Sequence, residues 1–166
     1  MSLVEVILYS ALSALLLSVL GGLFYVGFQT QAAAGGRDAA TGAAGVVSNS
    51  LQTGIRRASS ISASGTLLKA RVATGANSWQ CVTWVLTTDK KLKYKAGSAA
   101  ITDTDYSSST WTVLAVGASG GLAGSAFVAV GTQLTYSLTF TSGGITVPVA
   151  GIVTASAFGT GSPESC

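Results

Sequence analysis

The amino-terminal stretch MSLVEVILYSALSALLLSVLGGLFYVGF, residues 1–28, decides the fold of this 166-residue chain. Residues 6–28 contain no charged side chain and no proline. As a helix rising about 1.5 Å per residue, they are long enough to cross the hydrocarbon core of a bilayer, which is about 30 Å thick. We therefore expect a long apolar helix that lies in lipid or against other copies of the chain.

One carboxylate, Glu5, stands at the edge of this apolar run. A charge close to hydrocarbon is costly unless it is neutralised or paired, so an acidic residue there indicates a function. The alternative is that Glu5 merely lies at the level of the lipid headgroups. No Lys or Arg precedes Arg37, and no clear small-x-small cleavage site follows the run before the helix pattern continues, so the stretch is not typical of a secretory signal peptide.

Residues 2–5, Ser-Leu-Val-Glu, with the apolar run behind them, resemble the mature N-terminus of a type IV pilin or pseudopilin. In that family a hydrophobic first residue precedes a Thr/Ser-Leu-Ile/Val-Glu run, and Met1 and Glu5 fall on the matching positions. The resemblance covers about the first thirty residues closely. It implies a basic leader removed by a prepilin peptidase, an N-methylated Met1 and a pool of subunits in the membrane. It also implies a helical filament in which Glu5 pairs with the Met1 amine of a neighbouring copy.

Two adjacent glycines, Gly21 and Gly22, interrupt the apolar run. Each costs about 1 kcal/mol of helix propensity relative to alanine, so the helix has a weak point here. In the pilin family a proline near this position often accompanies an unwound stretch in the filament, and that proline is missing from this chain. Small residues also let helices approach closely in lipid. Close packing and local melting both stay open.

The helix is predicted to continue as an amphipathic segment through residues 31–64. Apolar residues recur there at steps of three and four from Ala40 to Ile61, and a weakly helix-forming Ser-Ala-Ser-Gly cluster follows at residues 62–65. The pair Gly35 and Gly36 indicates either a bend or a tightly packed helix face. The opposite face is polar enough for solvent or neighbouring subunits, and it carries Asp38, Ser48, Asn49, Gln52 and Arg56.

The remainder, residues 65–166, is predicted to be a β-rich domain. The expected strands cover residues 66–74, 79–87, 91–95, 111–116, 125–130, 132–141 and 145–157, with a glycine-rich linker at 117–124. The fold class is therefore α+β, with an apolar helix half (1–30) that protrudes and a second half (31–64) packed on an antiparallel sheet. The order of helix, strand and hairpin resembles minor pilins and J-type pseudopilins.

Composition argues against catalysis and against nucleic-acid recognition. Charged residues make up 9% of the chain, the net charge is +3, and there is no histidine. We expect no enzyme activity, no cofactor, no metal and no specific nucleic-acid partner, because a general base, a ligand cluster and a dense basic face are all missing. Asp103 and Asp105 lie in a loop of the kind that binds calcium in some pseudopilins, but an incomplete set of oxygen ligands favours a solvated turn.

The only two cysteines are Cys81, in a predicted strand, and Cys166, the last residue. Two cysteines in a surface protein more often form a bridge than a metal site, and a bridge here would fasten the C-terminal end to the sheet. The alternative is a pair of unbridged thiols.

The expected function is a structural subunit of a type IV pilus, held in the cytoplasmic membrane before assembly and exposed on the cell surface afterwards. Its partners would be copies of itself, the prepilin peptidase and the pilus assembly machinery. Two alternatives remain, a pseudopilin of a type II-like secretion system and a membrane-anchored adhesin that does not polymerise. An apolar N-terminal helix would serve all three functions, so the sequence does not distinguish between them.

Overall fold

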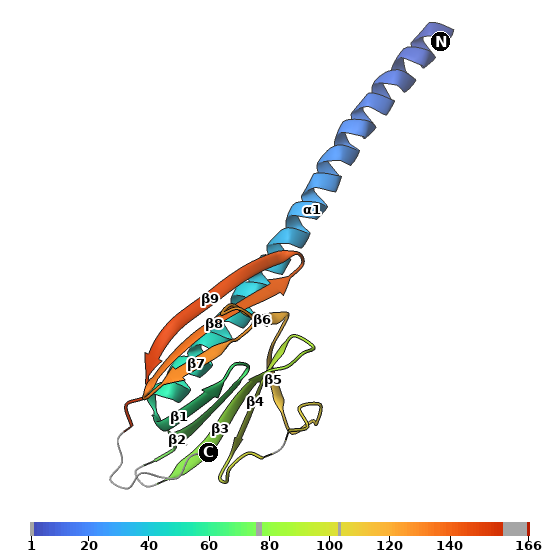
Figure 1. Ribbon diagram of the computed structural model, residues 1–166. Coiled ribbons are helices and arrows are strands. Elements are labelled where there is room, and N and C mark those ends of the chain that lie inside the picture. The colour runs from blue at the N-terminus through green and yellow to red at the C-terminus, as the bar shows by residue number, and fades with distance from the viewer. Residues whose placement is uncertain (1, 76–77, 103, 158–165) are drawn as a thin grey trace.

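The computed structural model describes residues 2–75, 78–102, 104–157 and 166. A single helix, α1 (Leu3–Arg56), extends far beyond a β-rich region that lies along one side of its C-terminal half (Figure 1). Its 54 residues correspond to a rod about 81 Å long. The predicted α+β class, with a long apolar N-terminal helix and antiparallel sheets, is confirmed.

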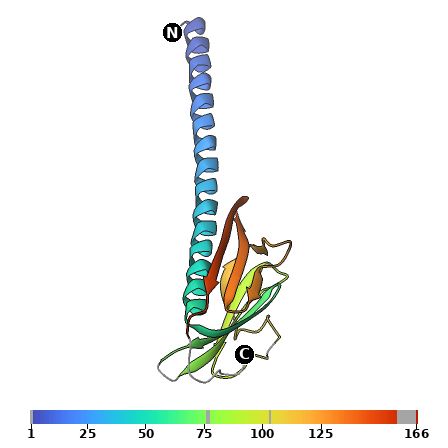
Figure 2. The same ribbon diagram turned by 60° about the vertical axis from the view of Figure 1, so that its left-hand side comes forward.

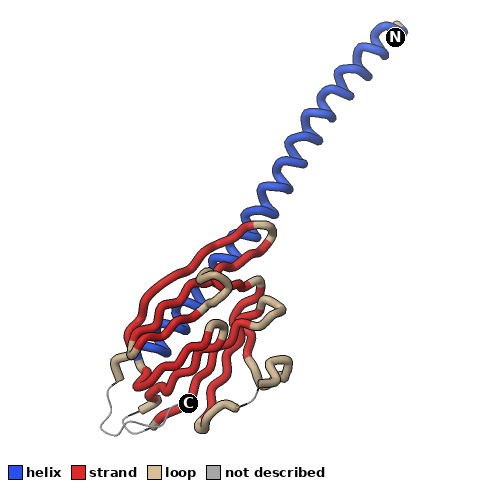
Figure 3. Tube along the Cα trace, in the orientation of Figure 1, coloured by secondary structure: helices blue, strands red, loops and turns tan. Residues whose placement is uncertain are grey.

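The β-strands form two antiparallel sheets, seen as red tubes in Figure 3. The first sheet has five strands in sequence order, and these are β1 (Ala58–Ser64), β2 (Leu67–Ala73), β3 (Trp79–Leu86), β4 (Lys91–Gly97) and β5 (Thr112–Val116). The second is built on β8, which pairs with all of its neighbours, and it comprises β6 (Ala118–Gly120), β7 (Phe127–Val130), β8 (Gln133–Ser142) and β9 (Ile145–Thr154).

The two sheets are joined by backbone hydrogen bonds near the start of β7. The amides of Ala126 and Phe127 both donate to the carbonyl oxygen of Gly65, each at 2.9 Å. The predicted turn between β8 and β9 is confirmed, because Gly143 and Gly144 both have positive φ, as a tight two-residue hairpin requires. This hairpin runs alongside α1 and its tip reaches furthest toward the protruding half of the helix (Figure 1).

The C-terminal half of α1 packs against both sheets through one apolar stripe, as Figure 2 shows from the side. The stripe follows the predicted three- and four-residue spacing, and its buried members are Ala40, Ala44, Val47, Leu51 and Ile55. The largest buried side chains opposite it are aromatic, and they are Trp84, Phe127, Tyr136 and Phe140. Burial of this stripe holds the sheets to the helix.

Glycines allow the closest approaches between helix and sheets. A methyl group at Gly36 would lie 2.8 Å from the carbonyl oxygen of Ser142, and one at Gly54 would lie 2.7 Å from the ring of Trp84. The predicted bend at Gly35 and Gly36 is absent, since α1 continues through both residues, and Gly36 alone lies on the tightly packed face.

Polar side chains on α1 take part in this packing, which corrects the predicted solvent-facing role of two of them. Ser48 lies 3.2 Å from the hydroxyl of Tyr136, and Gln52 donates to Ser48 at 3.1 Å. Nearby, the indole N–H of Trp84 donates to the hydroxyl of Ser50 at 3.1 Å. Buried Trp and Tyr side chains need such partners for their polar atoms.

The predicted extension of the helix to residue 64 is wrong, because α1 ends at Arg56 and residues 58–64 form β1. This segment, Ala-Ser-Ser-Ile-Ser-Ala-Ser, is rich in serine, which favours helices weakly. Pairing along β2, from Ala58 opposite Val72 to Ser64 opposite Leu67, satisfies its backbone instead. Gly65, the last residue of the Ser-Ala-Ser-Gly cluster, has positive φ in the turn between these strands.

The predicted linker at residues 117–124 also needs correction, because it contains the short strand β6. Its amides pair with residues 138–140 of β8, a partner that lies far along the chain. The other predicted strands are confirmed to within a few residues at their ends.

Candidate assembly interface

The first half of α1 has no packing partner among the residues that the structure describes. Every residue from 2 to 35 is exposed, and large apolar side chains occupy all sides of the helix. Phe24, for example, is 66% exposed and Leu15 65%. A water-soluble protein seldom exposes a continuous apolar surface of this extent, so this half requires lipid or other protein around it.

Length and hydropathy make α1 a candidate membrane span. The most apolar window of 18 residues has a mean hydropathy of 2.2, and none of it is buried. Among the described residues α1 alone meets these criteria, and its position at the N-terminus fits a membrane anchor or a signal sequence.

Glu5 lies in the first turn of α1, where the helix dipole favours a negative charge. Its backbone amide donates to the carbonyl oxygen of Ser2 at 3.0 Å, and Ser2 makes no side-chain cap. Within the described part of the chain Glu5 has no ion-pair partner. The next basic residue along the chain, Arg37, lies about 48 Å farther along the helix. A counter-ion for Glu5 must therefore come from outside residues 2–57.

Met1, the residue expected to supply that counter-ion in a neighbouring copy, lies outside the described residues. The pairing of Met1 with Glu5 stays a prediction.

Gly21 and Gly22 lie inside a continuous stretch of α1. Apart from the adjoining backbone of α1, no described atom lies within 4 Å of the position that a Cβ would occupy at either residue, so no packing contact in the described chain requires glycine there. The choice between close packing with another helix and local melting concerns an assembled state, and both stay predictions.

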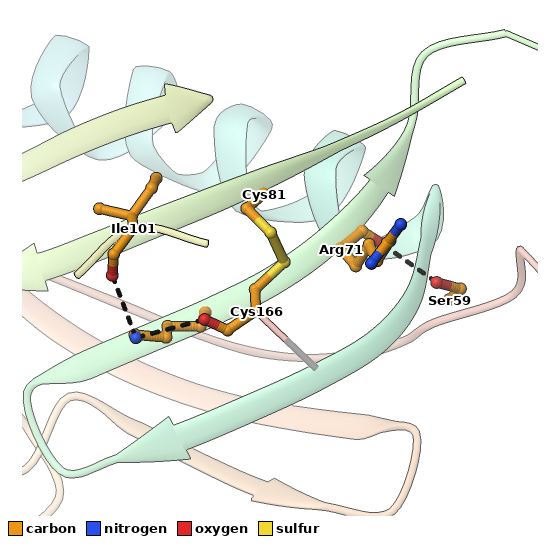
Figure 4. The surroundings of a disulfide bond; sticks show 6 residues. Ser59, Arg71, Cys81, Ile101 and Cys166 are labelled. Carbon is orange, nitrogen blue, oxygen red and sulfur yellow. Dashed lines mark hydrogen bonds between the residues drawn. A yellow bond between two sulfur atoms is a disulfide. The ribbon is translucent and has the colours of Figure 1, made fainter. Parts of the chain in front are cut away.

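The predicted disulfide between Cys81 and Cys166 is present, with the two Cα atoms 5.6 Å apart. It fixes the last residue of the chain to β3, on the face of the five-stranded sheet that is turned away from α1. The ammonium of Lys69 donates to the carbonyl oxygens of Ile101 and Cys166, at 3.2 and 3.4 Å, as dashed lines show in Figure 4. Cys81 packs with Val85, Ile101 and Trp111 in a second, smaller core.

No protein-family model, no curated protein and no solved structure matches this chain. The architecture itself is pilin-like, with a long apolar N-terminal helix packed on antiparallel sheets and a disulfide at the C-terminal end. The functional proposal therefore rests on the fold and on the properties of individual residues.

The acidic loop between β4 and β5 is only partly described. Asp105 accepts hydrogen bonds from the amide and hydroxyl of Ser107, at 3.0 and 2.5 Å, as in a tight Asx turn. Asp103 lies outside the described residues. The described part of the chain has no group of three potential metal ligands, and the expectation that this loop is a metal-free turn stays a prediction.

Sequence reasoning missed the environment of the lysines on β4. Lys91, Lys93 and Lys95 alternate with Leu92 and Tyr94, a pattern that places all three lysines on one face of the sheet. Such a face is expected to be solvated. Instead Lys93 is buried, because the loop after β4 crosses over it and the carbonyl oxygen of Tyr106 accepts a hydrogen bond from its ammonium.

Proposed function

We propose that this chain is a structural subunit of a helical filament of the type IV pilus kind. The observation that carries the proposal is the complete exposure of residues 2–35 of an apolar helix whose other half is firmly packed. Bundling of these helices at the centre of a filament would cover that surface on all sides. The gain over lipid comes from tighter packing and interhelical contacts, for which Gly21 and Gly22 offer room.

Glu5 sets the register of the bundle in this proposal. A carboxylate enclosed among apolar helices is strongly unfavourable alone, and pairing with the Met1 amine of a neighbour removes that penalty. Attraction between opposite charges is large where water is excluded. A subunit that docks one turn out of register would lose that attraction. Support comes from the lack of any cation near Glu5 in its own described chain.

Before assembly, the apolar half of α1 holds the subunit in the cytoplasmic membrane, and a prepilin peptidase and the pilus machinery act on it there. After assembly the sheets surround the helical core and face the cell exterior. The chain has a structural role in this scheme and neither a catalytic role nor a cofactor.

The proposal is tested by Glu5→Gln in a cell that carries a type IV pilus machinery. The variant should stay in the membrane fraction at the level of the unmodified chain, and the yield of sheared surface filaments should fall by about tenfold or more, because the charge pair is lost. Asp38→Asn serves as the control, since it removes a carboxylate from an exposed position of the same helix. Equal filament yields from Glu5→Gln and the unmodified chain would contradict the proposal.

The same preparation separates the alternative functions. Long filaments composed mainly of this chain support the pilus subunit, and short tip complexes attached to other subunits support a secretion pseudopilin. A chain that stays in the membrane fraction and never enters sheared material would support the anchored adhesin.

A further inference from the structure

Lys93 lies in an unusual place for a lysine. It is 8% exposed, and it faces away from α1, on the side of the first sheet that carries the small second core. Lys93 lies opposite Val85 on β3, and Val85 in turn lies opposite Leu67 on β2. On its other side Lys93 lies opposite Val113 on β5, so the charged side chain stands within an otherwise apolar row.

Within the described residues, the ammonium of Lys93 does not use all of its hydrogen-bond donors. It can donate three hydrogen bonds, and its one acceptor among the described residues is the carbonyl oxygen of Tyr106. The nearest acidic residue along the chain, Asp89, forms its ion pair with Lys91 instead, at 2.7 Å. A buried cation without a carboxylate is costly, and an anion at the unused donors would remove that cost.

A cavity of about 380 Å³ opens beside Lys93, between the loop after β4 and the ends of β2 and β3. This volume lies near the lower end of the range for small-molecule pockets, about 300–1,000 Å³. Leu67 and Val85 give it an apolar wall, and Thr66 and Thr88 contribute hydroxyls that no described hydrogen bond occupies. Asp89 also lines the cavity, and its ion pair with Lys91 at 2.7 Å balances its charge. The lining therefore combines one buried cation, a paired carboxylate, two available hydroxyls and an apolar wall.

We propose that this cavity binds an anionic sugar, a single sugar ring that carries a carboxylate or a phosphate. Lys93 pairs with the anionic oxygens, because a lysine ammonium is a compact charge that suits either group. The hydroxyls of Thr66 and Thr88 bond to hydroxyls of the ring, and its C–H face packs on Leu67 and Val85. The site lies in the β-rich region, so it does not rest on the proposed filament.

The test is calorimetric titration of the full chain in an uncharged polyoxyethylene detergent, which contains no sugar. Glucuronate and glucose 6-phosphate are the anionic probes, and glucose is the uncharged control. At least one anionic probe should bind saturably, and glucose should bind about tenfold more weakly or not at all, because it cannot pair with the buried ammonium.

Lys93→Met should lower the affinity for the anionic probe by about tenfold or more. Lys95→Met is the matched control, because Lys95 lies two residues along the same strand, holds the same loop through Thr110 at 3.0 Å and does not line the cavity. It should change the affinity by less than about threefold, as expected for a charge outside the site. Thr88→Val, which leaves the lysine in place, should weaken binding by about threefold or more.

Binding of glucose as tight as that of both anionic probes would overturn the proposal, and so would the absence of binding by all three at millimolar concentration. An equal loss in Lys95→Met and Lys93→Met would also overturn it, because Lys93 would then act only by holding the loop. If Lys93→Met fails to fold, Thr88→Val decides, and an unchanged affinity in that variant contradicts the site.

Discussion

Leu15 and Leu51 belong to the same helix, yet 65% of Leu15 is exposed and 0% of Leu51. The sheets cover one face of the second half of α1 from Gly36 onward and leave the first half bare. Among the described residues, only the second half of the helix therefore has a packing partner. In the proposed filament, folding and assembly would therefore use separate stretches of one helix, and each could be disturbed without the other.

The largest difference between the halves should appear on shortening these two leucines. Leu51→Ala removes a fully buried side chain and should lower the free energy of unfolding by about 2–5 kcal/mol. Leu15→Ala should change it by less than about 0.5 kcal/mol and should weaken filament assembly instead. Urea unfolding in detergent measures both, because all three tryptophans lie in residues 79–111 and report on the β-rich region. Equal losses of unfolding free energy in Leu15→Ala and Leu51→Ala would contradict this difference between the two halves of the helix.

The boundary between the halves is tested by adjacent glycines. Gly36→Ala adds a methyl group 2.8 Å from the carbonyl oxygen of Ser142 and should destabilise the fold by about 1–3 kcal/mol. Gly35→Ala points into open space and should be neutral or stabilising by up to about 1 kcal/mol, since alanine favours the helix. The same urea titration distinguishes them, and a loss of stability in Gly35→Ala would place the boundary elsewhere.

The smallest effect concerns a charge in the packed part of the chain. A hydrogen bond from Lys91, followed by one with Thr87, lowers the pKa of Asp89 from 3.8 to about 2. Because the folded state favours the ionised form, this stabilisation is complete above about pH 4 and is lost as the pH falls through about 2.

Asp89→Asn should therefore reduce the urea midpoint slightly at pH 7, and the two proteins should converge near pH 2. The effect stays small because the group is exposed to solvent. Filament yield should not change, in contrast to Glu5→Gln. A difference in midpoint that is the same at both pH values would rule out the ion pair as its cause.

The helix, most of the strands and the disulfide could be predicted because their signals are local or nearly so. The apolar run before Phe28 and the stripe through Leu51 are continuous patterns, and Gly143 with Gly144 specifies a hairpin. Only two cysteines were present to pair.

The errors arose where pairing or covering by another segment, near or far along the chain, decides the structure. Ala58 and Ile61 fit a helical spacing, but pairing with β2 makes their segment a strand. Residues 118–120 resemble a linker until β8 supplies their hydrogen bonds. Lys93 belongs to an alternating pattern that is typical of a solvated sheet face, and it is buried only because a later loop crosses over it.

Removal of detergent from the purified chain, followed by sedimentation velocity, tests the central claim most directly. The chain should leave the single-subunit boundary and form large, regular assemblies, because residues 2–35 have no partner among the described residues of their own chain. A chain that stays a single soluble subunit, with the first half of α1 open to solvent or folded back on its own sheets, would contradict it.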